Sequence, residues 1–331
     1  MNVCMVGHGM MGVWHSEALQ GADCCLHTVV GRRPEPTAEF AARFGYRKWT
    51  VSYEQALADP EVEVVIIAGP SETHAEMATA ALMAGKHTLV EIPLAMCQAD
   101  AERVVALAEA RGLTLGVVHP MRFRRERDAL MRRVAAGEES VSHAHGRFFI
   151  QRRVNIGATG YKRSWVDNLL WHHTTHLLDI GLWTLSGGDM RNVESRVRSI
   201  RGLMPACDPH TGIPMELVLS LDTHDDQSLA CIGSYYGHEY LYDTLTVTDR
   251  NSYRLDERSA TLATASGVQP IDSEQHNAWQ VPLDFIAALH QGREPKVPGW
   301  SVLPTMRLLQ QVQDQWDAIH GRQPLPGRPQ Y

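Results

Sequence analysis

The stretch that decides the fold is Val3-Cys4-Met5-Val6-Gly7-His8-Gly9-Met10-Met11-Gly12, in which a short apolar run leads into a GxGxxG motif. A helical pattern follows over residues 10–20, so the motif stands between a strand and a helix. Its glycines permit a tight turn and a close approach of the backbone to a pyrophosphate at the helix N-terminus. The alternative is a glycine turn that binds no ligand. The cofactor-binding residues predicted from this motif are Gly7, Gly9, Met10, Met11 and Gly12.

Strand and helix patterns alternate through the first 120 residues. The predicted strands are residues 3–6, 25–31, 62–69, 86–90 and 113–118. The helices predicted between them are residues 10–20, 37–44, 73–84 and 98–111. Continuous apolar runs such as residues 62–69 are typical of strands that are buried on both faces, as in a parallel sheet. The alternation therefore predicts βαβ units and a parallel Rossmann sheet over residues 1–120.

After His119 the pattern changes to alternating segments of period two, which favour antiparallel strands with one buried face. These strands are predicted at residues 144–152, 193–201, 216–221, 229–236 and 241–249. The predicted helices are residues 122–136, 169–185, 282–291 and 301–320. The fold class is therefore α/β, with a C-terminal α+β domain over residues 121–320 on an open, mostly antiparallel sheet. The last helices are candidates to pack back on the first domain, and residues 321–331 are expected to be a loose tail.

The composition excludes several classes of protein. No run of about 18 apolar residues exists, so no membrane-spanning helix is expected. The net charge of −7 argues against a nucleic-acid-binding protein. The six cysteines form no CxxC pair, so their spacing predicts neither a zinc site nor a disulfide framework. No basic segment precedes the glycine motif, so no signal peptide is expected and a reducing, cytoplasmic setting fits.

The end of the second strand bears on the choice of dinucleotide. NAD sites usually carry an acidic residue there, which binds the ribose 2′-hydroxyl. This strand ends in Gly31-Arg32-Arg33-Pro34, and its nearest carboxylate, Glu35, lies beyond the proline. Two guanidiniums are suited to a 2′-phosphate, which they can bind bidentately. Arg32 and Arg33 therefore favour NADP over NAD, although a pair of solvated surface arginines is the alternative.

Three further segments occur in a characteristic order along the chain. They are Gly69-Pro70-Ser71-Glu72-Thr73-His74, Val90-Glu91-Ile92-Pro93 and His176-Leu177-Leu178-Asp179. Together with the glycine motif they resemble the glucose–fructose oxidoreductase/inositol dehydrogenase family (Gfo/Idh/MocA). The resemblance implies a Rossmann domain followed by an α+β domain whose open sheet makes oligomer contacts. We therefore expect a homo-oligomer, with a dimer favoured.

Two positions depart from the pattern of the sugar and inositol enzymes in this family. Those enzymes usually read Glu-Lys-Pro at the turn, and that lysine holds the reacting hydroxyl. Here the position is Ile92, which neither hydrogen-bonds nor carries charge. Those enzymes also usually read Asp-x-x-x-His on the interrupting helix, whereas this chain has His172 and His176 at the two positions.

The run Arg163-Ser164-Trp165-Val166-Asp167-Asn168-Leu169-Leu170-Trp171-His172-His173 resembles one branch of the family, as do Glu91-Ile92-Pro93 and Arg152-Arg153-Val154-Asn155. This branch is the 4-carboxy-2-hydroxymuconate-6-semialdehyde dehydrogenases. The resemblance implies oxidation of the cyclic hemiacetal to 2-pyrone-4,6-dicarboxylate with NADP or NAD, in aromatic catabolism through protocatechuate 4,5-cleavage. The alternatives are another sugar or inositol-type dehydrogenase and a non-catalytic NADP-binding regulatory protein.

The histidines on the interrupting helix are the predicted catalytic residues. His172 and His176 are four apart and share one helix face, whereas His173 points elsewhere. Imidazole titrates near neutral pH, so it suits the removal of a hydroxyl proton as hydride leaves. His176 matches the family's catalytic histidine, Asp179 is a candidate to orient its ring, and His172 is a candidate to contact a substrate carboxylate. A zinc site lacks a full ligand set here, and packed core histidines are the other alternative. No metal is expected.

A di- or tricarboxylate substrate requires cations, and arginine matches carboxylate geometry. Residues 119–176 contain ten arginines, one lysine and five acids, so this window carries +6 while the rest of the chain carries −13. Arg152 and Arg153 are predicted to be adjacent on a strand and therefore to face opposite ways, so only one of them enters the pocket. The predicted substrate-binding residues are Arg122, Arg153, Arg163 and Trp165. Solvated surface charges are the alternative for each arginine.

The remaining predicted cofactor-side residues follow the ends of the Rossmann strands, where such sheets bind their ligands. Glu91 is expected to meet the nicotinamide ribose, and Pro70 and His74 to form a wall of the nicotinamide pocket. This group consists of Pro70, His74, Glu91, Pro93 and His119.

Overall fold

The computed structural model describes residues 1–156, 165, 168–270 and 277–321. These residues divide into two compact units. Unit 1 contains residues 1–123, 156 and 277–303, and unit 2 contains residues 124–155, 165, 168–270 and 304–321. The chain therefore enters unit 2 after Phe123, returns to unit 1 with its penultimate long helix and ends in unit 2.

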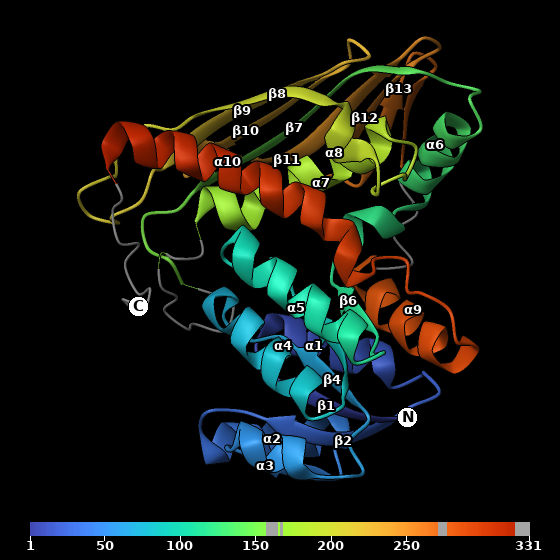
Figure 1. The fold of residues 1–331 in the computed structure, drawn as a ribbon, viewed down its shortest axis with the longest axis vertical. Helices are drawn as coiled ribbons and strands as arrows, with labels where there is room; N and C mark the ends of the chain where they lie inside the picture. Colours follow the sequence, from blue (N-terminus) through green and yellow to red (C-terminus); the bar gives the residue numbers. More distant parts are fainter. Residues whose placement is uncertain (157–164, 166–167, 271–276, 322–331) are drawn as a thin grey trace. The chain divides into compact units, whose positions relative to one another are not determined.

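Unit 1 is built on a six-stranded sheet in the order β3-β2-β1-β4-β5-β6 (Figure 1). Its strands are β1 (Asn2–Val6), β2 (Cys25–Val30), β3 (Lys48–Thr50), β4 (Val64–Ile67), β5 (His87–Val90) and β6 (Leu115–Val117). All neighbours pair in parallel, so the carboxyl ends of all six strands lie at one edge. The order reverses between β1 and β4, which is the switch point where doubly wound sheets bind dinucleotides.

Helices cover the sheet of unit 1. They are α1 (Met10–Leu19), α2 (Pro34–Phe44), α3 (Tyr53–Ala58), α4 (His74–Met83), α5 (Gln98–Ala110) and α9 (Asn277–Gln291). The late helix α9 completes this core, because its Phe285 packs with Met5 and Val64. The Phe285 ring takes the space beside Gly116, where a Cβ would lie 2.7 Å from the ring. A glycine on β6 therefore permits the close approach of α9.

Unit 2 is built on an eight-stranded sheet in the order β14-β13-β12-β11-β7-β10-β9-β8. Its strands are β7 (Val141–Gln151), β8 (Val197–Leu203), β9 (Glu216–Thr223), β10 (Ser228–Ser234), β11 (Tyr236–Thr248), β12 (Ser252–Asp256), β13 (Thr261–Thr264) and β14 (Gly267–Pro270). Only β10 and β7 pair in parallel among these described strands. The mostly antiparallel sheet predicted from the period-two pattern is confirmed.

One face of this sheet is covered by helices (Figure 1). They are α6 (Arg125–Ala135), the π-helical turn η3 (Leu169–His173), α7 (Thr174–Leu185), α8 (Val193–Arg196) and α10 (Leu303–His320). Helix α7 lies close to the strands because two glycines leave room: a Cβ on Gly146 would lie 2.7 Å from Leu177, and one on Gly181 would lie 2.4 Å from Leu229. No helix in the described part of the chain has the length and apolarity needed to cross a membrane.

Several elements differ from the sequence-based expectations. Residues 193–196 form the helix α8 rather than the start of a strand, so that prediction is wrong, and β8 begins at Val197. The short strands from β12 to β14 carried no clear alternation and were not predicted. Helix α9 begins five residues before Pro282, where its start had been predicted. The buried side chains of Ala278 and Val281 offset the backbone hydrogen bond that Pro282 cannot donate.

Candidate functional site

The glycine motif forms a turn between β1 and α1 in unit 1. Gly7 has φ +101°, and a Cβ there would lie 2.5 Å from the carbonyl oxygen of Ala68. A Cβ on Gly12 would lie 2.3 Å from the carbonyl oxygen of Gly7, so Gly12 lets the helix approach the turn. Gly9 differs, because it stands at the N-cap of α1 and nothing lies within 4 Å of the position its Cβ would take. Helix α1 begins with Met10 and Met11, directly after this open space. A pyrophosphate can therefore approach the N-terminus of the helix.

The carboxyl end of β2 presents two exposed arginines, Arg32 and Arg33. The His8 ring lies beside them, since a Cβ on Gly31 would lie 2.6 Å from two of its ring atoms. Burial lowers the pKa of His8, and the positive charges of Arg33 and Arg32 lower it further. This strand end is therefore a cationic surface that has His8 at its side, and it offers donors to an anion such as a 2′-phosphate.

The loops after β4 and β5 are tied together by His74. This buried histidine, at the start of α4, places Nδ1 2.7 Å from the carbonyl oxygen of Pro93 and Nε2 3.1 Å from that of Gly69. Pro70 stands at the N-cap of the short helix η1 (Ser71–Thr73), which precedes α4. The peptide bond between Ile92 and Pro93 is cis. His74 and Pro93 therefore hold the shape of the sheet edge at which the cofactor is expected.

Glu91 is also buried, and its Oε1 lies 2.6 Å from Nε2 of His15 on α1. This pair connects the turn after β5 to the helix that follows the glycine motif. Ile92 beside it is buried as well. Sequence reasoning missed His15, which is fully buried on α1 and whose signal in the sequence is its place three residues beyond Gly12.

Two predicted residues follow β6. His119 is fully buried just beyond the end of the strand. Arg122 is also buried, and its Nη1 and Nη2 donate to the hydroxyl and carbonyl oxygens of Ser301, each at 3.1 Å. Arg122 thus connects two chain segments within unit 1, where the sequence had suggested a substrate contact.

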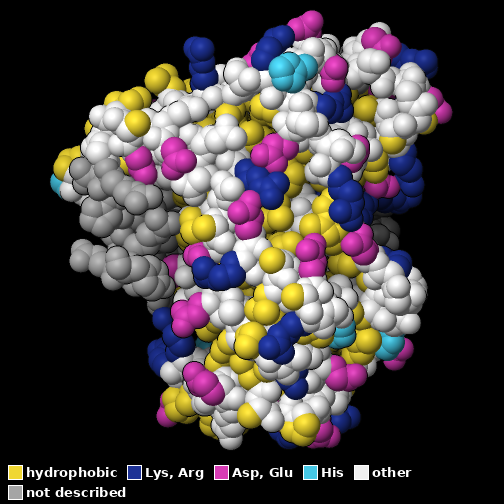
Figure 2. Space-filling model, in the orientation of Figure 1, with side chains coloured by type: hydrophobic (Ala, Val, Ile, Leu, Met, Phe, Trp, Pro, Cys, Tyr) yellow, Lys and Arg dark blue, Asp and Glu magenta, His cyan; other side chains and the backbone are white. Residues whose placement is uncertain are grey.

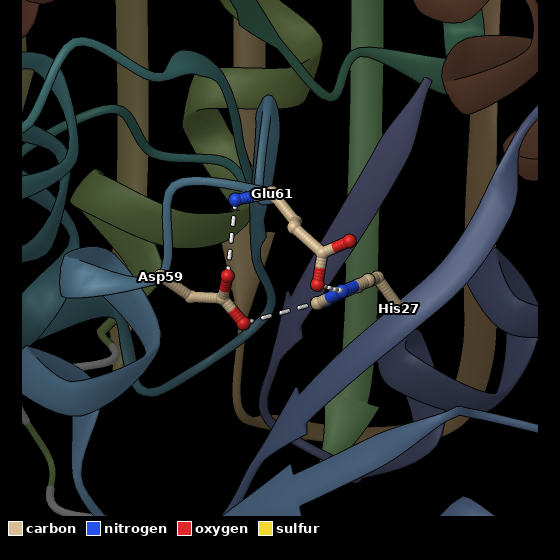
Figure 3. Close-up of side chains that lie close together, drawn as sticks. All are labelled: His27, Asp59 and Glu61. Carbon is tan, nitrogen blue, oxygen red and sulfur yellow. Dashed lines mark hydrogen bonds and ion pairs between the residues drawn. The ribbon is translucent and has the colours of Figure 1, made fainter.

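A possible metal-binding cluster lies at the amino end of the same sheet. His27, Asp59 and Glu61 bring their ligand atoms within 4.8 Å of one another (Figure 3). Lys48 already pairs with both carboxylates, at 2.7 Å from Asp59 and 3.3 Å from Glu61. Hydrogen bonds to Lys48 lower the pKa of each carboxyl group. The cluster is explained as an ion-pair network that joins β2, β3 and the segment before β4.

The predicted catalytic histidines lie in unit 2, where η3 runs into α7. His172 and His176 are half-buried, unlike the fully covered residues around them, and their ring centroids are 6.0 Å apart. His173 points to another side, where its ring stacks on Phe148 with centroids 3.7 Å apart. The single helix predicted over residues 169–185 therefore begins with a π-helical turn, a feature that is frequent at functional sites.

Asp179 is fully buried further along α7 and accepts a hydrogen bond from the hydroxyl of Thr305 at 3.1 Å. This bond ties α7 to α10. An aspartate that joins two helices has a structural task of its own, beside the orienting role predicted for it.

The other predicted substrate residues take different positions in unit 2. Arg153 is exposed, and its guanidinium lies 4.6 Å from the centroid of Tyr236. Arg152 is half-buried and lies 5.2 Å from the ring centroid of Tyr235. Trp165 packs against the same Tyr235 ring, with centroids 6.1 Å apart. Arg163 lies outside the described residues.

Part of the positive charge predicted for residues 119–176 is neutralised by carboxylates from later in the chain. Arg124 and Arg127 both pair with Glu257, and Arg147 pairs with Asp243. Burial acts to raise the pKa of Glu257, but the charges of Arg127 and Arg124 outweigh it and lower that pKa. The face drawn in Figure 2 likewise shows basic and acidic side chains interspersed. Asp243 lies on β11 and Glu257 directly follows β12, so the sequence window could not reveal these pairs.

Comparisons with known proteins match two parts of the chain. The model of the GFO_IDH_MocA oxidoreductase family with an NAD-binding Rossmann fold matches residues 1–119. A second model, for the C-terminal part of bacterial oxidoreductases, matches residues 126–249.

Among curated proteins, the chain is similar to 4-carboxy-2-hydroxymuconate-6-semialdehyde dehydrogenase of Sphingobium sp. (strain SYK-6), at 29% identity over 95% of this chain and 98% of that protein. It is also similar to 1,5-anhydro-D-fructose reductase of Ensifer adhaerens, at 32% identity over 38% of this chain and 37% of that protein. Among solved structures, levoglucosan dehydrogenase in complex with NADH has a TM-score of 0.81 at 18% identity, with 97% of this chain and 98% of that chain covered. This last likeness concerns the fold.

Proposed function

Because the chain belongs to the Gfo/Idh/MocA oxidoreductase family, we propose that it is an NADP-preferring dehydrogenase of a carboxylated cyclic hemiacetal. Its substrate is the hemiacetal of 4-carboxy-2-hydroxymuconate-6-semialdehyde, and its product is 2-pyrone-4,6-dicarboxylate. The observation that carries this proposal is the similarity to a dehydrogenase of that semialdehyde over 95% of the chain. The reaction belongs to protocatechuate 4,5-cleavage.

The residues of unit 1 fit the dinucleotide. Gly9 leaves space for the pyrophosphate at the N-terminus of α1, and the exposed Arg32 and Arg33 bind the 2′-phosphate. His74 and Pro93 hold the loops beside the nicotinamide, and Glu91 stabilises the turn through His15. A dinucleotide held by these residues would supply the hydride acceptor for the hemiacetal carbon.

The residues of unit 2 perform the proton transfer. His176 accepts the proton of the hemiacetal hydroxyl while the C–H bond breaks, so the two hydrogens leave as a proton and a hydride and a lactone carbonyl forms. His172, whose ring is 6.0 Å from that of His176, contacts a substrate carboxylate. Ile92 has no group that could accept or donate a proton, so we assign the proton transfer to the histidines.

A second candidate is a sugar-type dehydrogenase, which the partial similarity to 1,5-anhydro-D-fructose reductase favours. Ile92 speaks against it, because the lysine that holds a sugar hydroxyl in such enzymes is missing. A non-catalytic NADP-binding regulator is the third candidate, and it would bind the cofactor without turnover.

One experiment separates these functions. The protein is incubated with NADP, protocatechuate and a protocatechuate 4,5-dioxygenase, and NADPH absorbance and pyrone formation are followed together. We expect both to rise, and to rise more slowly when NAD replaces NADP. Omission of the dioxygenase is the control. Turnover only of levoglucosan or 1,5-anhydro sugars would support the second candidate, and NADP binding without turnover of any of them would support the third.

We further propose a homodimer that forms through the uncovered face of the unit 2 sheet. Its support is the exposure of apolar side chains on this face, with Leu203 74% and Val218 44% exposed on neighbouring strands. Sedimentation equilibrium tests this proposal: Val218→Arg should shift the wild-type dimer toward the monomer. The matched control is Trp49→Arg, because Trp49 has a similar exposure but belongs to the sheet of unit 1. This variant should leave the dimer intact.

A further inference from the structure

We propose that Arg152, and not its neighbour Arg153, is the cation that binds a carboxylate of the substrate. This inference rests on the proposed function and names a residue that sets the specificity of that site. The two arginines are adjacent in sequence and equal in chemistry, so only their surroundings distinguish them.

Arg152 is held in a fixed position directly after β7. Its backbone N–H donates to the carbonyl oxygen of Tyr235 at 2.9 Å. Its guanidinium lies over the ring of the same tyrosine, 5.2 Å from the centroid. Tyr235 is fully buried, so it provides a rigid platform. A guanidinium stacked in this way loses little conformational freedom when it binds an anion.

One end of this guanidinium is left without an acceptor. The Nη1 atom of Arg152 is buried and has no hydrogen-bond partner among the described residues of the chain. Burying a charged donor without a partner is costly, so such groups normally have one. A bound carboxylate supplies this acceptor, and the planar fork of arginine matches its two oxygens.

Arg152 belongs to the same side-chain cluster as the catalytic histidines. The Tyr235 ring beneath it lies 5.8 Å from the His173 ring, edge to face. The centroid of the His173 ring in turn lies 4.4 Å from that of His172, and the Trp165 ring also packs on Tyr235, with centroids 6.1 Å apart. The cluster thus joins one cation, flat aromatic surfaces and titratable imidazoles, which suits a planar, carboxylated ring.

Arg153 has different surroundings. It is exposed, and it lies over Tyr236, whose hydroxyl donates to a carboxylate oxygen of Asp208 at 2.8 Å. Both arginines follow the end of β7 at Gln151, and Arg153 lies in a bend, so the two side chains reach different tyrosines. A neighbouring carboxylate disfavours a second anion, so this side is poorly suited to the substrate.

The test compares Arg152→Met with its matched control, Arg153→Met. For each variant, the hemiacetal KM is measured with excess NADP, and the Kd of 2-pyrone-4,6-dicarboxylate is measured by calorimetry. We expect Arg152→Met to raise both constants by about 10- to 100-fold, the effect of losing a hydrogen-bonded ion pair. The NADP Kd should stay unchanged. Arg153→Met should change all of these constants by less than about twofold.

Arg152→Lys keeps the charge but lacks the planar guanidinium, so its hemiacetal KM and pyrone Kd should lie between those of wild type and Arg152→Met. It replaces the methionine variant if that protein fails to fold. Equal KM values for wild type and both Arg152 variants would overturn the inference while leaving the proposed function intact. A wild-type protein that neither turns over the hemiacetal nor binds the pyrone would overturn the proposed function itself. A raised KM in Arg153→Met alone would assign the carboxylate to that residue instead.

Discussion

The carboxyl edge of the unit 1 sheet and the histidine–aromatic cluster of unit 2 are built in different ways. The first presents backbone features: a glycine turn, a helix N-terminus and loops that follow strand ends. The second consists of side chains from positions far apart in the chain, such as Phe148, His173 and Tyr235. A site formed by backbone groups can be predicted from contiguous sequence motifs. A site formed by packed side chains depends on which distant strands become neighbours in the fold. The following changes test this difference.

The largest effect is expected for His176→Asn, which removes the proposed base. Because a positioned general base contributes about 10²- to 10⁴-fold, kcat should fall by that range. NADP binding, measured by quenching of protein fluorescence, should be unaffected because the cofactor residues belong to unit 1. His143→Asn, on β7, serves as a control histidine. Near-normal kcat in His176→Asn would remove this residue from the catalytic role.

Two glycine substitutions should separate ligand binding from folding within one motif. Gly9→Ala places its Cβ in open space, so thermal stability should be unchanged while NADP affinity falls by about 10-fold or more. Gly12→Ala meets a carbonyl oxygen at 2.3 Å, so the free energy of unfolding should fall by about 1–3 kcal/mol as well. Thermal scans with and without NADP measure both quantities. Equal stability loss in the two variants would contradict the assigned roles.

The choice of cofactor should depend on Arg32 and Arg33. Their joint replacement by alanine should raise the NADP Kd by about 10-fold and leave the NAD Kd nearly unchanged, because only NADP carries the 2′-phosphate. Arg111→Ala, an exposed arginine after α5, is the control and should leave both constants unchanged. If both dinucleotides lost affinity equally, the two arginines would not be selective for the phosphate.

The smallest effect concerns pH and stability. Burial lowers the pKa of His87, so the unfolded chain binds its proton more readily than the folded chain. The free energy of unfolding should therefore be unaffected by His87 above about pH 6.5 and should decline as the pH falls below it. In the folded protein the Nδ1 atom of His87 accepts from the N–H of Thr114, and protonation of that nitrogen ends the bond.

His87→Asn keeps a hydrogen-bond acceptor without the titration, so its unfolding free energy should decline less between about pH 6.5 and 5. Urea unfolding at several pH values measures the slope, and the exposed His224→Asn is the control. An unchanged slope in His87→Asn would show that acid sensitivity arises elsewhere.

The sequence predicted unit 1 well because buried parallel strands are continuous apolar runs, as in Val64–Ile67. The sequence-based prediction is wrong where an element is too short to show a hydrophobic period. Three-residue β3 and the strands from β12 to β14 are stabilised by pairing with neighbours, which a local window does not contain. Likewise, the helix over residues 193–196 has only four residues, and its N-cap residue Asn192 makes no side-chain capping hydrogen bond.

Within the site, the sequence identified the glycine turn and the facing pair of histidines, since both follow from fixed local geometry. It could not tell that Arg122 is bonded to Ser301, 179 positions away. Nor could it tell that Glu257 pairs with two arginines of the basic window. Such contacts depend on which distant segments fold together.

The sequence by itself determined that this chain has a dinucleotide-binding sheet, a second mostly antiparallel sheet and a pair of histidines at helical spacing. These properties follow from hydrophobic period and from the backbone geometry that glycine permits. Only the tertiary structure decided which charges remain available to a ligand. Arg152 and Arg153 are the same residue type, and they differ because one lies over the buried Tyr235 and the other over the half-buried Tyr236. The energy of a charge depends on its neighbours and its burial, and both are properties of the folded chain.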